Sequence, residues 1–323
     1  MIIRLSSIGD IVLTTNAIRC IKTQIPDAQL HYLLKKEYAE ILTNNPYLTK
    51  IHTFKPADKK LLTLLKAEKF DYIIDLQHNY RSLKLCRKLK VPVQHLHKLN
   101  VKKWLLVNLK LNLLPKTHVV DRYLDTTAIL PQKIKNDGKG LDFFLSDEAE
   151  QPIKQLQLSH FVAIAMGSKH FTKQIPLDKL QFICSQIHKP IVLLGGNDCM
   201  ENAKILSQSI DNQIFNLCGK LTIPQSAACI KYSDLLLSGD TGLMHIAAAL
   251  NKPIISLWGN TTADFGMTPY FPNGKEIFSF IAEVKNLKCR PCSKLGFSAC
   301  PKKHFKCMYN IDYQQVINLI NQY

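Results

Sequence analysis

The sequence predicts an α/β protein with two parallel-sheet domains, and three observations support this fold class. Short apolar runs alternate with amphipathic helical patterns, the alternation restarts at about residue 160, and runs such as IVLLG and IISLW are apolar on both faces. Alternating strands and helices are typical of βαβ units. A strand that is apolar on both faces needs a helix on each side of its sheet, which is the situation of parallel strands.

The first half of the chain contains four expected strands, at residues 2–5, 28–34, 51–54 and 70–77, and three expected helices, at residues 10–24, 37–45 and 57–69. Residues 135–158 combine Gly, Asp and other charged side chains, and we interpret them as the passage into a second domain.

The second half contains five expected strands, at residues 160–168, 189–196, 214–219, 234–240 and 252–259. Its expected helices are residues 177–188, 199–210, 223–233, 241–250 and 312–323. Open α/β sheets bind ligands at the carboxyl ends of their strands. Two such sheets in tandem therefore predict an active site between the domains.

The composition is that of an ordinary globular protein. The chain has 323 residues, of which 46% are hydrophobic and 21% charged. No apolar run reaches the roughly 18 residues of a membrane span. Arg4 interrupts the apolar N-terminus, which argues against a signal peptide. We therefore expect a cytoplasmic protein.

The formal net charge is +17, and one segment is basic throughout. Residues 76–120 contain no Asp or Glu, and their ten basic residues are Arg81, Lys84, Arg87, Lys88, Lys90, Lys98, Lys102, Lys103, Lys110 and Lys116. This pattern favours nucleic acid, an anionic membrane surface or a phosphorylated substrate. A nucleic-acid site would need interleaved aromatic residues, and this segment has only Tyr80 and Trp104. A surface of solvated lysines is the other interpretation.

The segment LLLSGDTGLMHIAAALNKPIISLWG, residues 235–259, is the strongest local signal. A strand leads into Gly239, Asp240, Thr241 and Gly242, and a helix follows at once. The free N–H groups and the dipole of a helix N-terminus favour a phosphate. Asp240 could accept hydrogen bonds from sugar hydroxyls or simply cap the helix. His245 is interpreted as a packed histidine or a site residue.

A second candidate turn follows the strand that ends at Gly167 and Ser168. Lys169, His170 and Lys173 come next, and a lysine at such a strand end can neutralise a diphosphate. A solvated loop is the alternative. The sequence lacks GxGxxG, GxxxxGK[ST], HExxH, GxSxG and Asp-x-Asp. Lysines and backbone amides, instead of a metal ion, are therefore expected to neutralise a diphosphate.

Four motifs together resemble glycosyltransferase family 9, the bacterial ADP-heptose:lipopolysaccharide heptosyltransferases. They are IRLSSIGDIVLTTNAI near the N-terminus, DLQHNYRS at 75–82, KQIP at 173–176 and SGDTGLMHIAAALNKPIISLWG at 238–259. The resemblance spans both halves of the chain in the same order.

The resemblance implies a GT-B fold with two Rossmann-like domains facing a cleft. We expect an acceptor domain at 1–150, a nucleotide-sugar domain at 151–310, and a helix at 311–323 that returns to the N-terminal domain. The implied reaction is an inverting transfer of heptose, or a related sugar, that requires no cofactor. The implied donor is ADP-heptose and the acceptor an acidic, lipid-linked lipopolysaccharide core. The apolar residues among the lysines of HKLNVKKWLLVNLKLNLLP suit peripheral docking on the membrane.

The resemblance also implies roles for individual residues. Asp10 matches the general base for the acceptor hydroxyl, and Lys173 matches the lysine that contacts the donor diphosphate. The implied donor-binding residues are Ser168, Glu201, Asp240, Thr241, Gly242, Leu243 and His245. The implied acceptor-binding residues are Ser7, Gly9, Gln77, Arg81 and Lys84.

Four of the ten cysteines cluster near the C-terminus, at Cys289, Cys292, Cys300 and Cys307, with His304 among them. A CxxC pair followed by two further cysteines predicts either a structural zinc site or reduced thiols that order a loop. A disulfide is disfavoured in the expected compartment. Three other functions stay open: a GT-B enzyme with another donor or acceptor, a non-catalytic sugar-nucleotide binder, and a basic nucleic-acid-binding protein.

Overall fold

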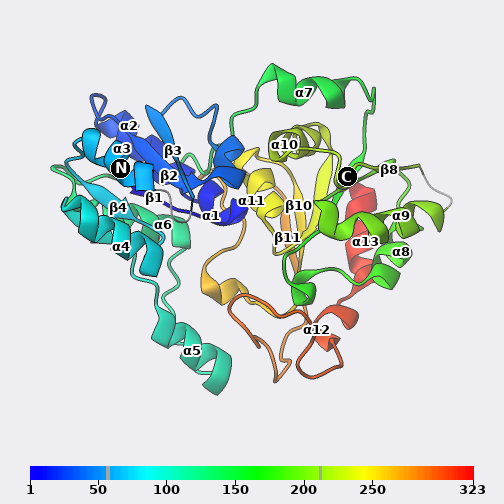
Figure 1. Cartoon of the computed structure of the whole chain (residues 1–323). Helices are drawn as coiled ribbons and strands as arrows, with labels where there is room; N and C mark the ends of the chain where they lie inside the picture. The colour runs from blue at the N-terminus through cyan, green and yellow to red at the C-terminus, as the bar shows by residue number, and fades with distance from the viewer. Residues whose placement is uncertain (56–58, 211–212) are drawn as a thin grey trace. The chain divides into compact units, whose positions relative to one another are not determined.

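The computed structural model describes residues 1–55, 59–210 and 213–323, and they form two compact units (Figure 1). The first unit comprises Met1–Leu99 and Lys116–Phe144, and the second comprises Asn100–Pro115 and Leu145–Tyr323. Each unit is described by itself below. The predicted domain boundary at residue 150 stays a prediction.

The first unit is built on a five-stranded parallel sheet with the order β3-β2-β1-β4-β5. The strands are β1 (Ile2–Ile3), β2 (His31–Lys35), β3 (Lys50–Phe54), β4 (Ile73–Asp75) and β5 (Val93–His95). Its helices are α1 (Ile8–Val12), α2 (Thr15–Gln24), α3 (Lys59–Ala67), α4 (Tyr80–Leu89) and α6 (Val119–Asp125), with 3-10 turns at Lys36–Ile41 and Thr126–Ile129. Ile3, Leu33, Leu65 and Ile73 are among the buried residues of its core.

The helix expected at residues 10–24 is two helices in the structure. Thr14 Oγ1 donates to the Ile11 carbonyl oxygen and Thr15 Oγ1 to that of Val12, both at 2.7 Å. Hydroxyls that bond back to the preceding turn bend or end a helix, which explains the break between α1 and α2. The helix expected at 37–45 is a 3-10 turn, Lys36–Ile41. Of the helix expected at 57–69, residues 57–58 lie outside the described residues, and α3 covers Lys59–Ala67.

The second unit is built on a six-stranded parallel sheet with the order β11-β10-β9-β6-β7-β8. The strands are β6 (Val162–Ala165), β7 (Ile191–Leu194), β8 (Ile214–Asn216), β9 (Leu235–Gly239), β10 (Ile254–Trp258) and β11 (Ser279–Glu283). Its helices are α5 (Asn100–Leu109), α7 (Asp147–Lys154), α8 (Leu177–Cys184), α9 (Met200–Gln208), α10 (Ile223–Tyr232), α11 (Gly242–Ala249), α12 (Lys306–Tyr309) and α13 (Tyr313–Gln322). Short 3-10 turns cover Phe171–Lys173, Asn197–Cys199 and Ala263–Phe265.

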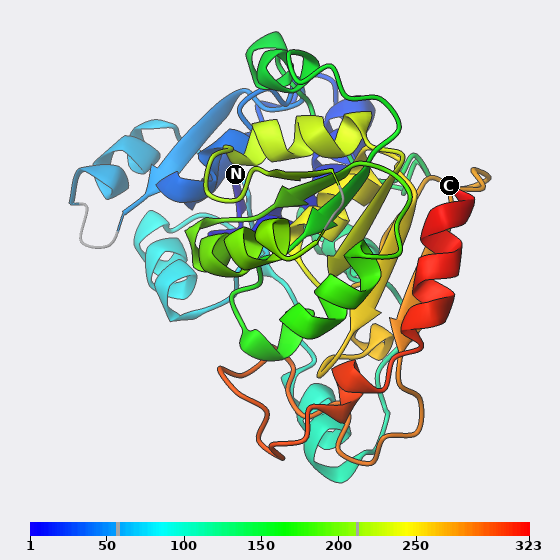
Figure 2. The same cartoon turned by 90° about the vertical axis from the view of Figure 1, so that its right-hand side faces the viewer.

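Helix α13 belongs to the core of the second unit. Val316, Ile317 and Ile320 recur at the spacing of one helical face and are buried with the residues of α8. Asn321 Nδ2 donates to the Gln186 carbonyl oxygen at 2.9 Å, so the end of α13 is fixed to the residues that follow α8. Figure 2 shows α13 in red at the C-terminus. The predicted return of this helix to the N-terminal domain stays a prediction.

The prediction of two parallel sheets with buried central strands is confirmed. Every residue of β6, β7, β9 and β10 is buried, as strands covered on both faces must be. Among the helices that the structure describes, none has the length and apolar composition needed to span a membrane.

Candidate active site

The strand order of each sheet predicts where a ligand would bind. In the first sheet the order reverses between β1 and β4, and in the second between β6 and β9. Ligands of open α/β sheets bind beyond the carboxyl ends of the strands at such a switch point. Asp10 and Gln77 follow β1 and β4, and Lys173 and Asp240 follow β6 and β9. The predicted catalytic and donor residues thus lie in the segments that leave these switch points.

Asp10 is held in a turn that the sequence SSIGD forms after β1. Ser7 is the N-cap of α1, and Asp10 closes a capping box with it. The carboxylate Oδ2 accepts from the Ser7 backbone N–H at 3.2 Å and from the Ser7 hydroxyl at 3.0 Å. Gly9 is buried below the turn. Asp10 therefore caps α1, and because its turn follows β1 the same position is compatible with the predicted role as a base.

Arg4 is the partner of Asp10 that sequence reasoning missed. Its Nη2 lies 2.6 Å from Asp10 Oδ1, while Tyr123 Oη lies 3.5 Å from the same oxygen. Burial opposes ionisation of Asp10, but the Arg4 guanidinium and the Ser7 hydrogen bonds outweigh it, so the pKa of the carboxyl lies below its ordinary value. Asp10 is therefore ionised at neutral pH, with one-fifth of its side chain exposed to solvent.

A buried carboxylate organises the predicted acceptor segment. Asp75, fully buried at the end of β4, accepts from the backbone N–H groups of Gln77 and His78, from Ser82 Oγ at 2.8 Å and from His95 Nδ1 at 3.0 Å. Gln77 itself accepts from the Leu5 N–H at 2.8 Å, which ties the segment to β1. The Asp75 contacts fix the turn that begins α4.

Of the other predicted acceptor residues, Arg81 and Lys84 lie on the exposed face of α4, and Ser7 is exposed in the turn before α1. Their role in acceptor binding stays a prediction.

In the second unit, Lys173 and Asp240 form an ion pair. Lys173 Nζ lies 2.5 Å from Asp240 Oδ2, and Thr261 Oγ1 donates to the same oxygen at 2.9 Å. Both charged side chains are largely buried. The two residues were predicted separately as donor contacts, and the structure brings them together.

Two glycines allow this close approach. A Cβ on Gly239 would lie 2.5 Å from the Lys173 carbonyl oxygen, and one on Gly259 would lie 2.8 Å from that of Thr172. Only glycine therefore lets the 172–173 turn rest against the carboxyl ends of β9 and β10. The Thr172 side chain also accepts from the Phe297 N–H at 2.9 Å, which holds the turn from the other side.

Helix α11 begins without a side-chain cap. Its N-cap is Thr241, but the hydroxyl of Thr241 lies 2.8 Å from Ser238 Oγ and makes no capping bond. The first-turn amides, those of Gly242 and Leu243 included, are therefore available at the positive end of the helix dipole. His245 is buried one turn further along.

Two predicted donor residues and one unexpected residue complete this edge. Ser168 follows β6, and its carbonyl oxygen accepts from Gln174 Nε2 at 2.8 Å. Glu201 is exposed in the first turn of α9. Asn260 follows β10 and is almost fully buried, and its amide atoms have no hydrogen-bond partner within the described part of the chain. A buried amide needs hydrogen-bond partners, which a ligand can supply. The sequence did not predict this residue, because its burial is visible only in the structure.

The cysteine loop, residues 289–307, is attached to the carboxyl end of β10 through Arg290. Its Nε donates to the carbonyl oxygens of Gly259 and Thr261 at 2.8 and 2.9 Å, and its Nη2 pairs with Glu283 at 2.5 Å. All ten cysteines are free thiols. Cys289 Sγ lies 3.8 Å from His304 Nε2, which brings two residues of the predicted cluster together. Burial raises the pKa of the Cys292 thiol, and the neighbouring thiols of Cys289 and Cys300 raise it further.

Comparison with known proteins agrees with the motifs. Residues 59–321 match the model of glycosyltransferase family 9 (heptosyltransferase). A curated relative, lipopolysaccharide heptosyltransferase 1 of Campylobacter coli, is 27% identical over 285 residues, which cover 80% of this chain and 83% of the relative.

Two solved structures cover the chain almost completely. The family 9 glycosyl transferase of Veillonella parvula covers all of this chain and 97% of its own with a TM-score of 0.77 at 18% identity. E. coli heptosyltransferase WaaC with ADP-2-deoxy-2-fluoro heptose covers 99% and 98% with a TM-score of 0.69, also at 18% identity. These likenesses and the two parallel sheets confirm the expected GT-B fold class. The chain belongs to glycosyltransferase family 9, the heptosyltransferases.

Proposed function

We propose that this glycosyltransferase moves heptose from ADP-heptose to an acceptor sugar of the lipopolysaccharide core, with inversion and without a metal ion. The observation that carries the proposal is that a carboxylate follows the switch point of one sheet and a lysine follows that of the other. One sheet presents an ionised carboxylate, Asp10, and the other presents Lys173 beside the uncapped N-terminus of α11. The donor and acceptor follow the relatives, one of which is a lipopolysaccharide heptosyltransferase and one of which was solved with an ADP-heptose analogue.

In the proposed reaction the acceptor hydroxyl oxygen attacks the anomeric carbon of the donor. The bond from that carbon to the diphosphate oxygen breaks, the diphosphate leaves with the electron pair, and Asp10 takes the hydroxyl proton. A carboxylate of low pKa can do this because the hydroxyl becomes acidic as the new bond forms. Backside attack by the acceptor inverts the anomeric configuration.

The departing diphosphate gains negative charge, and positive groups aimed at it lower the barrier. We propose that Lys173 exchanges Asp240 for the diphosphate, and that the Gly242 and Leu243 amides hold a phosphate oxygen. Asp240, released from the ion pair, is then free to accept from sugar hydroxyls. Ser168, Glu201 and His245 are proposed to line the nucleotide.

The central test combines nucleotide binding with turnover. ADP, GDP and UDP sugars are compared by thermal shift, and ADP-heptose is then tested for transfer to a lipid A–Kdo acceptor. Asp10→Asn should lower turnover by about 10²–10⁴-fold and leave the ADP-induced shift unchanged. Asp27→Asn, at an exposed position of the same unit, is the matched control.

Two outcomes would contradict the proposal. Full turnover by Asp10→Asn would remove Asp10 as the base, and no thermal shift with any nucleotide sugar would remove the donor site. Lys173→Met separates the roles further, because it should raise the donor KM and lower kcat, whereas Lys204→Met on the exposed face of α9 should change neither.

We further propose that the segment 100–115 docks the enzyme on an anionic membrane. Val101, Trp104, Leu109, Leu111 and Leu113 each expose more than half of their surface. Lys102 and Lys110 stand among them, and the segment contains no acidic residue. Lys110 Nζ also donates to the Pro291 carbonyl oxygen at 2.7 Å, so the segment is fixed to the cysteine loop, beside which α5 lies in Figure 2. Apolar residues with lysines beside them are the signature of an interfacial anchor.

Tryptophan fluorescence tests this docking directly. Of the two tryptophans, Trp104 is exposed and Trp258 is buried, so a blue shift on adding vesicles reports Trp104. The shift should occur with phosphatidylglycerol vesicles and not with phosphatidylcholine alone. Leu111→Ser with Leu113→Ser should weaken sedimentation with vesicles, whereas Leu64→Ser, at an exposed leucine of α3 in the first unit, should not. Equal binding by all variants would contradict the proposal.

The cysteine spacing also supports the proposal of a structural zinc ion at Cys289, Cys292, Cys300 and Cys307. Among the described residues, no three side chains of this loop bring their ligand atoms within 4.8 Å of one another. Zinc content of the purified protein, compared with that of a Cys289→Ser, Cys292→Ser variant, decides it. Equal zinc content would contradict the proposal.

A further inference from the structure

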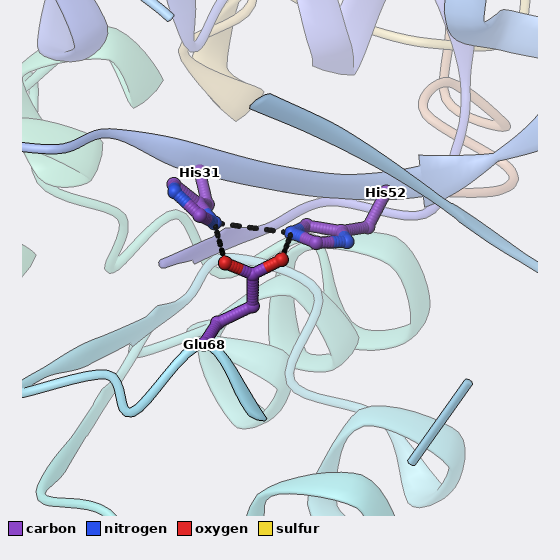
Figure 3. Close-up of side chains that lie close together, drawn as sticks. All are labelled: His31, His52 and Glu68. Carbon is purple, nitrogen blue, oxygen red and sulfur yellow. Dashed lines mark hydrogen bonds and ion pairs between the residues drawn. The ribbon is translucent and has the colours of Figure 1, made fainter. Parts of the chain in front are cut away.

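Two histidines and a glutamate meet in the first unit, outside the candidate active site. His31 Nδ1 lies 3.1 Å from His52 Nε2, and the two Glu68 oxygens lie 3.8 Å from His31 Nδ1 and 3.9 Å from His52 Nε2. Figure 3 shows both rings and the carboxylate pointing toward one another. In the described part of the chain this is the one group of three such side chains whose ligand atoms lie mutually within 4.8 Å.

The parallel sheet creates this arrangement. His31 begins β2 and pairs in register with Lys50 of β3, so His52, two residues further along β3, lies on the same face of the sheet. Glu68 directly follows α3, which returns the chain to that face. The three residues therefore come from three different elements.

The surroundings hold the two rings in place. The His31 and His52 side chains are only 10% and 6% exposed, and Glu68 is 21% exposed. The Phe70 ring meets both imidazoles edge-on, with centroids 5.2 Å from His31 and 6.2 Å from His52. Rings fixed in this way present their nitrogens with little remaining rotational freedom.

The distances suit a tetrahedral ion. Zinc–nitrogen bonds of about 2.0–2.1 Å imply ligand-to-ligand separations of about 3.3 Å. The histidine pair is at 3.1 Å, and the carboxylate needs to move by only about half an ångström from 3.8–3.9 Å. Two imidazoles and one carboxylate are also a set that zinc accepts.

We propose that His31, His52 and Glu68 bind one divalent transition-metal ion, zinc in the first instance, with the fourth position open to water. The site lies at the amino end of β2, whereas Asp10 follows the carboxyl end of β1. The ion would join β2, β3 and the end of α3 and take no part in sugar transfer.

Lys50 is the competitor of the metal. Its Nζ lies 2.5 Å from Glu68 Oε1, and more than half of its side chain is exposed. The ammonium group therefore has room to leave the carboxylate when an ion arrives. Removing it should favour the metal, because it both frees Glu68 and takes away a repelling charge.

Zinc titration of chelator-treated protein tests the proposal. It is done in a Cys289→Ser, Cys292→Ser background, with a chromophoric chelator as competitor. His31→Gln and His52→Gln should each weaken zinc binding by more than about tenfold, and Lys50→Met should strengthen it. His188→Gln, a histidine of the second unit, is the matched control. The melting temperature with and without zinc shows that the variants fold.

The outcomes separate cleanly. Unchanged zinc binding in both histidine variants would overturn the proposal and leave an ordinary histidine hydrogen bond beside a Lys50–Glu68 ion pair. Should a histidine variant fail to fold, Lys50→Met decides alone, since it keeps every ligand, and unchanged or weaker binding by this variant overturns the proposal. Sugar transfer is expected to be unchanged by Lys50→Met, so this test is independent of the proposed function.

Discussion

Arg4 Nη2 contacts Asp10 Oδ1 at 2.6 Å, and the same guanidinium donates to the Ser6 carbonyl oxygen at 3.0 Å and to that of Leu76 at 2.6 Å. One largely buried cation thus joins the turn after β1, the first turn of α1 and the end of β4. Its position makes Arg4 a positioning residue for Asp10, because it acts through the carboxylate and sets its charge.

Arg4→Gln should move the acid limb of the pH–rate profile. In the native protein the pKa of Asp10 lies below its ordinary value, so kcat/KM should stay constant through the neutral range and fall only at strongly acidic pH. Without the cation, burial raises that pKa, and the limb should move to higher pH. Arg122→Gln, which loses a bond to the His97 carbonyl oxygen and none to Asp10, is the control. An unchanged limb in folded Arg4→Gln would show that Asp10 is not the titrating base.

Gly239→Ala should damage both stability and donor binding. The new methyl group would lie 2.5 Å from the Lys173 carbonyl oxygen, so the 172–173 turn must move. We expect a loss of about 1–3 kcal/mol in unfolding free energy and a higher donor KM. Urea denaturation and donor titration measure the two effects.

Gly167→Ala is the control for that change, because its methyl group would meet the nearest atoms at an ordinary 3.4 Å. Equal stability of the two alanine variants would contradict the steric argument at Gly239.

Asp75→Asn should destabilise the first unit. The buried carboxylate accepts four hydrogen bonds. In asparagine an NH₂ group replaces one of the two oxygens, so this donor would face the N–H or O–H donors of the partners. We expect a loss of about 2–3 kcal/mol, measured by urea denaturation, and a smaller loss of about 1 kcal/mol for Ser82→Ala, which removes one of the four bonds. A loss for Asp75→Asn no larger than that for Ser82→Ala would show that the carboxylate does not organise this turn.

Glu150 should make stability depend on pH in the acid range. Lys231 Nζ and Tyr232 Oη each donate to this carboxylate at 2.6 Å, and these bonds and one from Lys154 lower the pKa of Glu150 from 4.5 to about 2. A depressed carboxyl pKa stabilises the fold above the unfolded pKa, and this contribution disappears as the pH falls from about 4.5 to 2. Glu150→Gln should therefore lower the melting temperature at neutral pH.

The difference between Glu150→Gln and the native chain should shrink steadily below about pH 4.5. Glu40→Gln, at an exposed position, should give no such difference. A difference for Glu150→Gln that stays constant between pH 7 and pH 3 would contradict the assignment.

Local patterns were sufficient to predict the sheet cores and the turns of the site. The runs that became β6, β7, β9 and β10 are long and apolar, and small residues mark the turns at Asp10 and Asp240. Of the four edge strands in the described sheets, β3 and β8 were predicted and β5 and β11 were missed: β5 reads Val-Gln-His and β11 reads Ser-Phe-Ile-Ala-Glu, which are short or mixed in polarity. An edge strand is covered on fewer sides, so its sequence carries a weaker signal.

The contacts that define the site are set by strand pairing over long stretches of chain. Arg4 meets Leu76 because β1 pairs with β4, and Asp240 meets Thr261 because β9 pairs with β10. The pairing of β2 with β3 likewise brings His31 to His52, and no sequence motif joins either of them to Glu68. Residue types at strand ends were therefore enough to predict candidate site residues, whereas the partners that these residues contact depend on the three-dimensional register.

The N-terminus of α11 lacks a side-chain cap, which has a consequence for stability. Thr241 uses its hydroxyl on Ser238, so the helix forgoes a capping bond that is typically worth about 1 kcal/mol. On the proposed donor site, the diphosphate itself becomes the cap and completes the helix. On that proposal, donor binding adds hydrogen bonds to the first turn of α11 and should stabilise the second unit.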